Sequence, residues 1–417
     1  MKKSSFLIMF ICSIFLFYKY IAQLYPTLIA SDLMNQYYLS AVQVAILASS
    51  YYYSYSIMQV FSGFIVDKFD IRIPAFLAIL IVAIPIFLFS HTNNFYFMCF
   101  YRCVMGAGAS FATVLYVKSA ACWFDPRMFS IISSFLATAA MLGATIGSTP
   151  VAKIFETLGW RHGLEFISFL GIIIAFIALI FLTKKSPDNE STLEKKTLSR
   201  KEILSPFYKK ENWLLMSYAG LTFAPIIILG GLWGTPFLTK KFSIEVTQAS
   251  YLLSSMFLGV GSGALVWAFI TTKLNNKKDF MYICNLLSIL LLVLIIYPSL
   301  SYFVTLILFF LLGFSSSVFM VSFDLCRIYN SVQLIGIASA FMNSGEGIVA
   351  SILEPLIGKI LDIRKGTNPT FSLYDFKVAF SLILFCFILS SICLLFIRVK
   401  ENSFFFKRQN RFKLSIR

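Results

Sequence analysis

Residues 73–91 read IPAFLAILIVAIPIFLFSH and contain no Lys, Arg, Asp or Glu. A helix rises about 1.5 Å per residue, so about 20 residues of this kind cross the roughly 30 Å hydrocarbon core of a bilayer. The stretch therefore predicts a membrane-spanning helix.

The composition of the whole chain agrees with this stretch. Of 417 residues, 59% are hydrophobic and 13% are charged, and the mean hydropathy is +0.82. A soluble domain carries about 25% charged residues and could not bury this much apolar surface. The composition excludes a disordered or collagen-like chain and argues against an ordinary cytosolic enzyme.

Twelve apolar runs long enough to span can be drawn, and a lipid-exposed segment must be helical to satisfy its own backbone. The runs cover residues 5–31, 41–66, 73–91, 94–119, 128–152, 163–183, 213–238, 248–272, 280–299, 302–325, 335–361 and 375–397. Lys2 and Lys3 imitate a secretory signal, but the run continues past Ala22 without a small-x-small cleavage site. We therefore predict an all-α membrane protein with 12 transmembrane helices.

The basic residues predict the orientation and the domain boundaries. Most of the 35 Lys and Arg residues fall in loops on the side of the N-terminus, which places both termini in the cytoplasm. The longest hydrophilic stretch, 184–212, is a predicted linker between bundles at 1–183 and 213–397, and 398–417 is a basic tail. We interpret the net charge of +16 as contact with membrane lipid, and expect no nucleic-acid partner.

An internal repeat relates the two bundles. At an offset of about 205 residues, Tyr51–Arg72 falls on Met256–Lys277. Lys153 and Glu156 likewise fall on Lys359 and Asp362. Several matches at one offset predict two pseudo-symmetric six-helix bundles that face each other across a central cavity.

The end of the second span carries a candidate gate, GFIVDKFDIR (63–72). Gly63 permits a close helix approach. Asp67 lies beside Lys68 and near Arg72, where it could latch one helix end against another.

This stretch, with RCVMGAG (102–108) and GATIGSTP (143–150), resembles signatures of the major facilitator superfamily. FYKY (17–20) and EPLIG (354–358) resemble motifs of a bacterial subgroup that includes metabolite and phagosomal nutrient transporters. The resemblance implies a bacterial inner-membrane protein whose cavity is lined by helices 1, 4, 7 and 10. It also implies transport by alternating access and no cofactor.

Ionisable residues inside spans are functional candidates, because burying one in lipid costs at least about 2.5–3.5 kcal/mol. The N-terminal bundle offers Lys19, Arg102 and Lys118, and the C-terminal bundle offers carboxylates. These carboxylates are Asp324, Glu346 and Glu354. Lys118 and Asp324 occupy equivalent places in the repeat and form a predicted gate; alternatively, Lys118 snorkels to the interface.

We assign substrate binding to five side chains. They are Lys19, Arg102, Tyr52, Trp233 and Asp324. The structural alternatives are that Tyr52 lies at the membrane interface and that Trp233 only packs between helices. We assign proton coupling to Glu346, with Arg102 or Asp324 as its partner, because burial makes a carboxyl hold its proton more tightly. A static ion pair of Glu346 with Arg102 or Lys19 is the alternative.

The leading hypothesis is a secondary active transporter of a small polar metabolite. Cations in one half and carboxylates in the other favour proton-coupled uptake of an amino acid, short peptide or similar zwitterion. The alternatives are an exporter or antiporter of organic anions or a siderophore, and a receptor or scaffold that does not transport. We expect a monomer that is not an enzyme. We also expect no metal site, because the eight Cys include no C-x-x-C pair and only two His occur.

Overall fold

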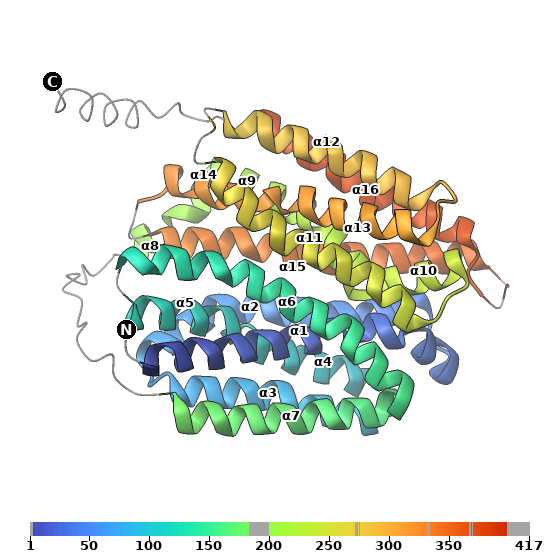
Figure 1. Cartoon of the computed structure of the whole chain (residues 1–417), viewed down its shortest axis with the longest axis horizontal. Coiled ribbons are helices and arrows are strands. Elements are labelled where there is room, and N and C mark those ends of the chain that lie inside the picture. The colour runs from blue at the N-terminus through green and yellow to red at the C-terminus, as the bar shows by residue number, and fades with distance from the viewer. Residues whose placement is uncertain are drawn as a thin grey trace.

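The computed structural model describes residues 3–124, 126–182, 200–271, 274, 276–331, 334–366, 368 and 370–397. Over these ranges the chain is helical, with short turns and no strand (Figure 1). Most of the expected linker and the whole basic tail lie outside the described residues.

The N-terminal half contains seven helices, α1 to α7. They are α1 (Lys3–Tyr37), α2 (Ala41–Lys68), α3 (Arg72–His91), α4 (Phe95–Ala109), α5 (Phe111–Trp123), α6 (Pro126–Leu158) and α7 (Trp160–Phe181). The helices α4 and α5 follow each other across Ser110 and make up one expected span, so this half supplies six spans.

The C-terminal half runs from α9 to α16, after the short helix α8 (Arg200–Tyr208). Its first span joins α9 (Lys210–Ile228), the π-helix η1 (Leu229–Trp233) and α10 (Gly234–Phe242). Its other elements are α11 (Val246–Thr271), α12 (Lys277–Ile296), α13 (Tyr302–Ser316), the 3-10 helix η2 (Ser317–Met320), α14 (Val321–Tyr329), α15 (Ile335–Lys365) and α16 (Leu373–Phe396).

In the described part of the chain, ten helical segments are long and apolar enough to cross a membrane. The helices α2 and α15, with 28 and 31 residues, are also long enough to span, which is consistent with the expected six spans in each half. Polar residues cap the starts of several helices. Ser40 and Gln43 form a capping box at the start of α2, and Asn94 accepts from two N–H groups at the start of α4.

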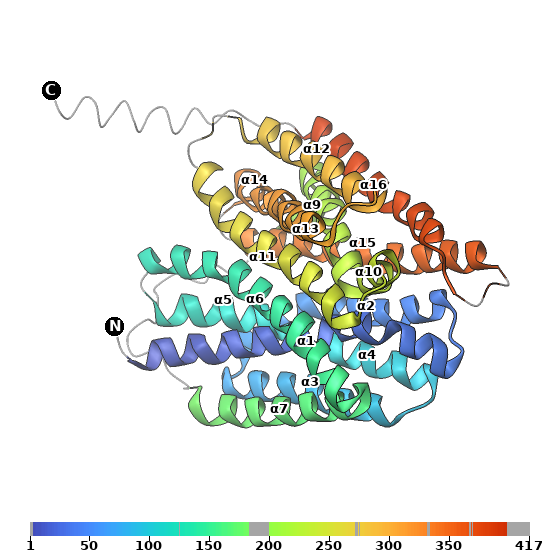
Figure 2. The same ribbon diagram turned by 45° about the vertical axis from the view of Figure 1, so that its right-hand side comes forward.

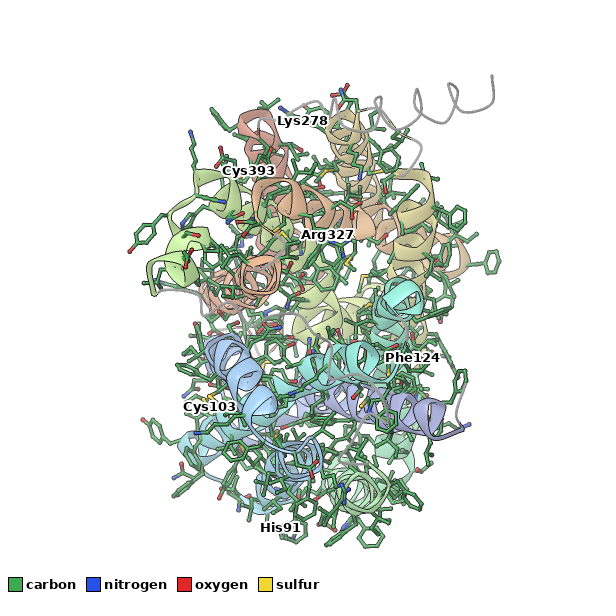
Figure 3. The ribbon with its side chains drawn as sticks, turned by 90° about the vertical axis from the view of Figure 1, so that its left-hand side faces the viewer. His91, Cys103, Phe124, Lys278, Arg327 and Cys393 are labelled. Carbon is green, nitrogen blue, oxygen red and sulfur yellow. The ribbon has the colours of Figure 1, made fainter. Side chains whose placement is uncertain are left out.

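The two halves lie one above the other in Figure 2, with α15 of the C-terminal half beside α2 of the N-terminal half. The main contacts between them join α2 to α15 and α6 to α11, and α1 also touches η1. We call the end where α7 ends and α9 begins the linker side, and the end where α1 ends and α2 begins the opposite side. Figure 3 views the linker side, where Phe124 marks the N-terminal half and Arg327 the C-terminal half.

Among the described residues, most hydrogen bonds that join the two halves lie toward the opposite side. Thr27 of α1 donates to the Leu232 carbonyl at 3.0 Å and to the Thr235 hydroxyl at 3.1 Å. Tyr53 of α2 donates to the Ser351 carbonyl of α15 at 2.9 Å. This arrangement ties the halves together at one end of the molecule.

Candidate functional site

Lys19 lies in the middle of α1 with a side chain that is only 4% exposed. Its Nζ donates to the Tyr55 hydroxyl at 3.2 Å. The same atom lies 4.5 Å from the ring centroids of Tyr20 and Tyr55, so two aromatic faces share the charge. This position agrees with the expectation from the sequence that Lys19 lies inside the protein, away from lipid.

Glu346 of α15 is the carboxylate that acts electrostatically on Lys19. Its Oε1 is out of reach of solvent and has no hydrogen-bond partner among the described residues. Among the described residues no ion pair joins Lys19 to Glu346, so the two charges act on each other without direct contact. The site thus offers a cation from one half and a free carboxylate oxygen from the other.

Arg102 of α4 is fully buried, and it binds backbone rather than a carboxylate. Its guanidinium donates to the carbonyls of Ala22 at 2.5 Å, Gln23 at 3.3 Å and Ala48 at 3.4 Å. It also lies 4.8 Å from the ring centroid of Tyr51. Arg102 therefore joins α1, α2 and α4, an arrangement that its position in a span does not reveal.

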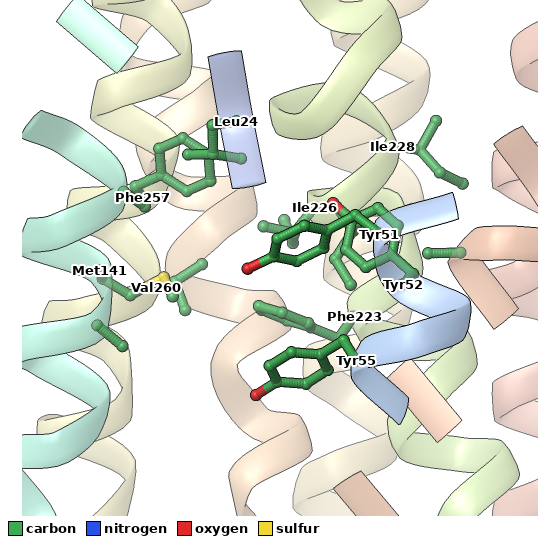
Figure 4. Packing of buried hydrophobic residues seen from close by; sticks show 14 of the residues in the cluster. Leu24, Tyr51, Tyr52, Tyr55, Met141, Phe223, Ile226, Ile228, Phe257 and Val260 are labelled. Carbon is green, nitrogen blue, oxygen red and sulfur yellow. The ribbon is translucent and has the colours of Figure 1, made fainter. Parts of the chain in front are cut away.

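The tyrosines of α2 form a buried aromatic surface, apart from Tyr53, which is 47% exposed. Tyr51, Tyr52 and Tyr55 project into the buried cluster that also contains Phe223 of α9 (Figure 4). The Tyr52 hydroxyl accepts from Gln23 Nε2 at 3.3 Å. Tyr52 is thus buried between the helices rather than in an interfacial belt.

Trp233 of η1 contacts Glu354 of α15. Trp233 is fully buried, and its Nε1 donates to the Glu354 backbone carbonyl at 3.3 Å. The Glu354 carboxylate accepts from the Ser49 hydroxyl of α2 at 3.0 Å. Sequence reasoning identified Glu354 as an intramembrane charge but gave it no role, because its contact with Ser49 joins residues far apart in the chain.

Asp324 and Lys118 lie near the linker side and have other partners in this conformation. Asp324 Oδ2 accepts from Lys277 Nζ at 3.0 Å, and this ion pair belongs to the C-terminal half. Lys118 Nζ donates to the Val66 carbonyl near the end of α2. The predicted gate between Lys118 and Asp324 therefore stays a prediction for another conformation.

The loop after α2 forms local contacts. Arg72 pairs with Asp70 at 3.9 Å, and Lys68 is exposed. A Cβ added at Gly63 would meet nothing within 4 Å, so no helix packs closely there in this conformation. The side chain of Asp67 lies outside the described residues.

A surface cavity of about 800 Å³ opens between the halves on the opposite side. Its lining includes the carboxylates Asp32, Glu156 and Glu245, together with Trp160. The described residues contain no group of three or more His, Cys, Asp or Glu that could hold a metal ion.

A family model described as Major Facilitator Superfamily matches residues 6–237 and 215–415. Among curated proteins, the uncharacterized transporter YybO of Bacillus subtilis (strain 168) is 24% identical over 170 residues, which are 41% of this chain and 39% of that protein. The hexuronate transporter of the same organism is 20% identical over 247 residues, 57% of this chain and 58% of that protein. The chain spans about half the length of the curated relatives it matches.

Among solved structures, the fold is similar to a bacterial homolog of the human lysosomal transporter Spinster in an inward-facing, unoccupied conformation. The TM-score is 0.77 at 13% sequence identity, and the match covers 96% of this chain and 99% of that one. At this identity the likeness concerns the fold alone.

Proposed function

We propose, from the premise that this chain belongs to the Major Facilitator Superfamily, that it moves a small polar metabolite across a membrane by alternating access coupled to a proton gradient. Membership makes the chain a multi-pass membrane transporter rather than an enzyme. The substrate, the direction and the coupling ion are the proposed part.

The observation that carries the proposal is the pair formed by Lys19 and Glu346. An ammonium from one half and a carboxylate from the other act on each other electrostatically inside the protein, and among the described residues no ion pair joins them. A zwitterion could satisfy both, with its carboxylate on Lys19 and its ammonium on Glu346. Between substrate loads, a proton on Glu346 would remove the charge that has no partner.

The cavity on the opposite side favours a substrate with a positive group. Asp32, Glu156 and Glu245 supply a negative potential there, which attracts cationic and zwitterionic solutes and repels anions. If both termini are cytoplasmic, as the basic loops predict, this cavity faces the outside and the hydrogen bonds below it close the outer side. The conformation is then inward-facing, in keeping with its structural likeness.

Arg102 takes a different role in this account. Its donors bind main-chain carbonyls of α1 and α2, so we assign it to holding the helices that carry Lys19 and Tyr55 rather than to binding substrate. The coupling partner of Glu346 is then Lys19.

The test is a ligand screen followed by transport. Detergent-purified protein is heated with amino acids, short peptides and sugar acids, because a ligand of the native state raises the Tm. Uptake of each hit is then measured in proteoliposomes with wild type, Lys19→Ala and Lys19→Arg, with Lys359→Ala as an exposed control on α15. We expect a zwitterionic hit whose uptake is lost in Lys19→Ala; normal uptake in that variant would overturn the site.

A second candidate is the transport of an organic anion such as a sugar acid. The similarity to a hexuronate transporter and the aromatic pocket around Lys19 favour it. A lysine alone suffices for a monocarboxylate, so this candidate predicts that Glu346→Gln still binds its ligand, whereas a zwitterion would lose its ammonium partner.

A further inference from the structure

Glu354 of α15 is a fully buried carboxyl in the contact between the two halves. One oxygen, Oε2, accepts from the Ser49 hydroxyl of α2 at 3.0 Å. The other, Oε1, is out of reach of solvent and has no hydrogen-bond partner among the described residues. No account of substrate binding at Lys19 and Glu346 uses this carboxyl.

The surroundings of Glu354 leave it without a cation in direct contact. Tyr52 from α2 and Arg102 from α4 are the ionisable groups that act on it electrostatically. The guanidinium of Arg102, however, is engaged by main-chain carbonyls of α1 and α2. The side chain of Trp233, from η1, donates to the backbone of Glu354 rather than to its carboxylate.

Close packing at η1 shuts this position off. A Cβ added at Gly231 would lie 2.9 Å from the Tyr52 hydroxyl and 3.5 Å from Glu354 Oε1. The π-helix thus presents a glycine to both groups, and π-helical turns are frequent at functional sites. When the halves part on the opposite side, the contact between Ser49 and Glu354 has to break, and water then reaches the carboxyl.

The same side chain is therefore sealed in one conformation and hydrated in the other. An ionised carboxylate that is buried without a cation is strongly unfavourable, whereas a neutral carboxyl of the same shape is not. We propose that Glu354 binds a proton when the halves close on the opposite side and releases it when they open. One proton from water adds to the carboxylate on closure and returns to water on opening.

This inference rests on the alternating-access part of the proposed function, but not on Lys19, Glu346 or the substrate. It predicts the direction of the pH effect. Low pH supplies the proton and favours the form closed on the opposite side, and high pH favours the open form. Glu346, by contrast, would be the coupling carboxyl at the substrate site.

The test follows the distance between the halves on the opposite side. Spin labels are introduced through unnatural amino acids at Tyr96 and Phe303, because the chain contains eight cysteines. These residues are 80% and 68% exposed at the starts of α4 and α13. Full-length protein in lipid is measured from about pH 5 to about pH 8, the range in which maximal stability is usual.

We expect the wild-type distance to lengthen as the pH rises. Glu354→Gln should lose this response and stay closed, Glu354→Asp should keep it, and Lys359→Ala, an exposed change on the same helix, should keep it as the control. A wild type that does not respond to pH, or a Glu354→Gln variant that responds like wild type, would overturn the proposal. Should Glu354→Gln not fold, the wild type and Glu354→Asp can still overturn the proposal, because both must respond.

Discussion

The carboxylate of Asp362, near the end of α15, accepts hydrogen bonds from the backbone N–H groups of Ala41 and Val42, each at 2.9 Å. Ala41 and Val42 are the first residues of α2, whose N–H groups have no partner within the helix. A side chain of one half therefore caps a helix of the other half, where the helix dipole favours a negative charge.

The internal repeat places a second carboxylate contact between the halves at the start of α11. The side-chain hydroxyl of Thr247, the second residue of α11, donates to Glu156 Oε2 at 2.7 Å, so this contact joins two side chains. Glu156 and Asp362 correspond in the repeat, as do the starts of α2 and α11. We call these two contacts the acidic latches, and both lie on the opposite side.

The acidic latches should stabilise the form closed on the opposite side. Removing a helix cap costs about 1–2 kcal/mol, which changes an equilibrium about 5- to 30-fold. We therefore expect Asp362→Ala to raise the open population by such a factor, and Glu156→Ala to act in the same direction. The distance between labels at Tyr96 and Phe303 measures this population.

The control for the latches is Lys359→Ala, an exposed change one turn before Asp362. It should leave the distance distribution as in wild type. Equal distributions for Asp362→Ala and Lys359→Ala would show that the latch does not hold the halves.

Close backbone packing at Gly358 supports the same closed form. A Cβ there would lie 2.7 Å from the Ala41 carbonyl oxygen, which belongs to the other half. Gly358→Ala should therefore push the halves apart, and overpacking of this kind costs about 1–3 kcal/mol.

Gly259→Ala distinguishes this effect from general destabilisation. A Cβ at Gly259 would lie 2.0 Å from the Phe310 carbonyl oxygen, within the C-terminal half. We expect Gly259→Ala to lower the Tm without opening the opposite side. Gly358→Ala should instead open the opposite side and change the Tm less. The same outcome for both variants would contradict this division.

Arg102 should act on stability more than on binding. Arg102→Lys keeps the charge but loses the planar fork, and Arg102→Ala leaves three carbonyls without their donor. We expect Arg102→Ala to lower the free energy of unfolding by an amount on the order of 3 kcal/mol, seen as a lower Tm in detergent. Arg102→Lys should keep a ligand-induced rise in Tm; a normal Tm with that rise abolished would instead place Arg102 in the substrate site.

The gate predicted between Lys118 and Asp324 can be tested by exchanging the charges. Lys118→Asp and Asp324→Lys should each reduce transport, and the second also places a lysine beside Lys277. If the two groups meet when the linker side closes, the double exchange should recover part of the transport rate measured in proteoliposomes. If the effects of the two single variants on the transport rate simply multiply in the double variant, the two groups do not interact and the predicted gate is wrong.

The sequence was sufficient to predict the spans and the halves. The length of an apolar run is a local pattern, and the repeat is a match between two stretches of the same chain. It also placed Lys19 inside the protein, because too many apolar residues precede it for its charge to reach water. It could not assign Arg102 to carbonyls of α1 and α2, since any buried arginine looks the same in a sequence. The repeat relates Glu156 to Asp362 in the sequence. Only the structure shows that each carboxylate contacts the start of a helix of the other half, α11 or α2.

The central claim, that Lys19 and Glu346 form the shared site of substrate and proton, is tested most directly with Glu346→Gln in proteoliposomes. Glutamine keeps the shape of the side chain but cannot exchange a proton, so accumulation driven by a pH gradient should be lost. The account predicts that Glu346→Gln loses accumulation driven by an imposed pH gradient, whether or not substrate exchange across the membrane persists. Accumulation at the wild-type level under the same gradient would contradict it.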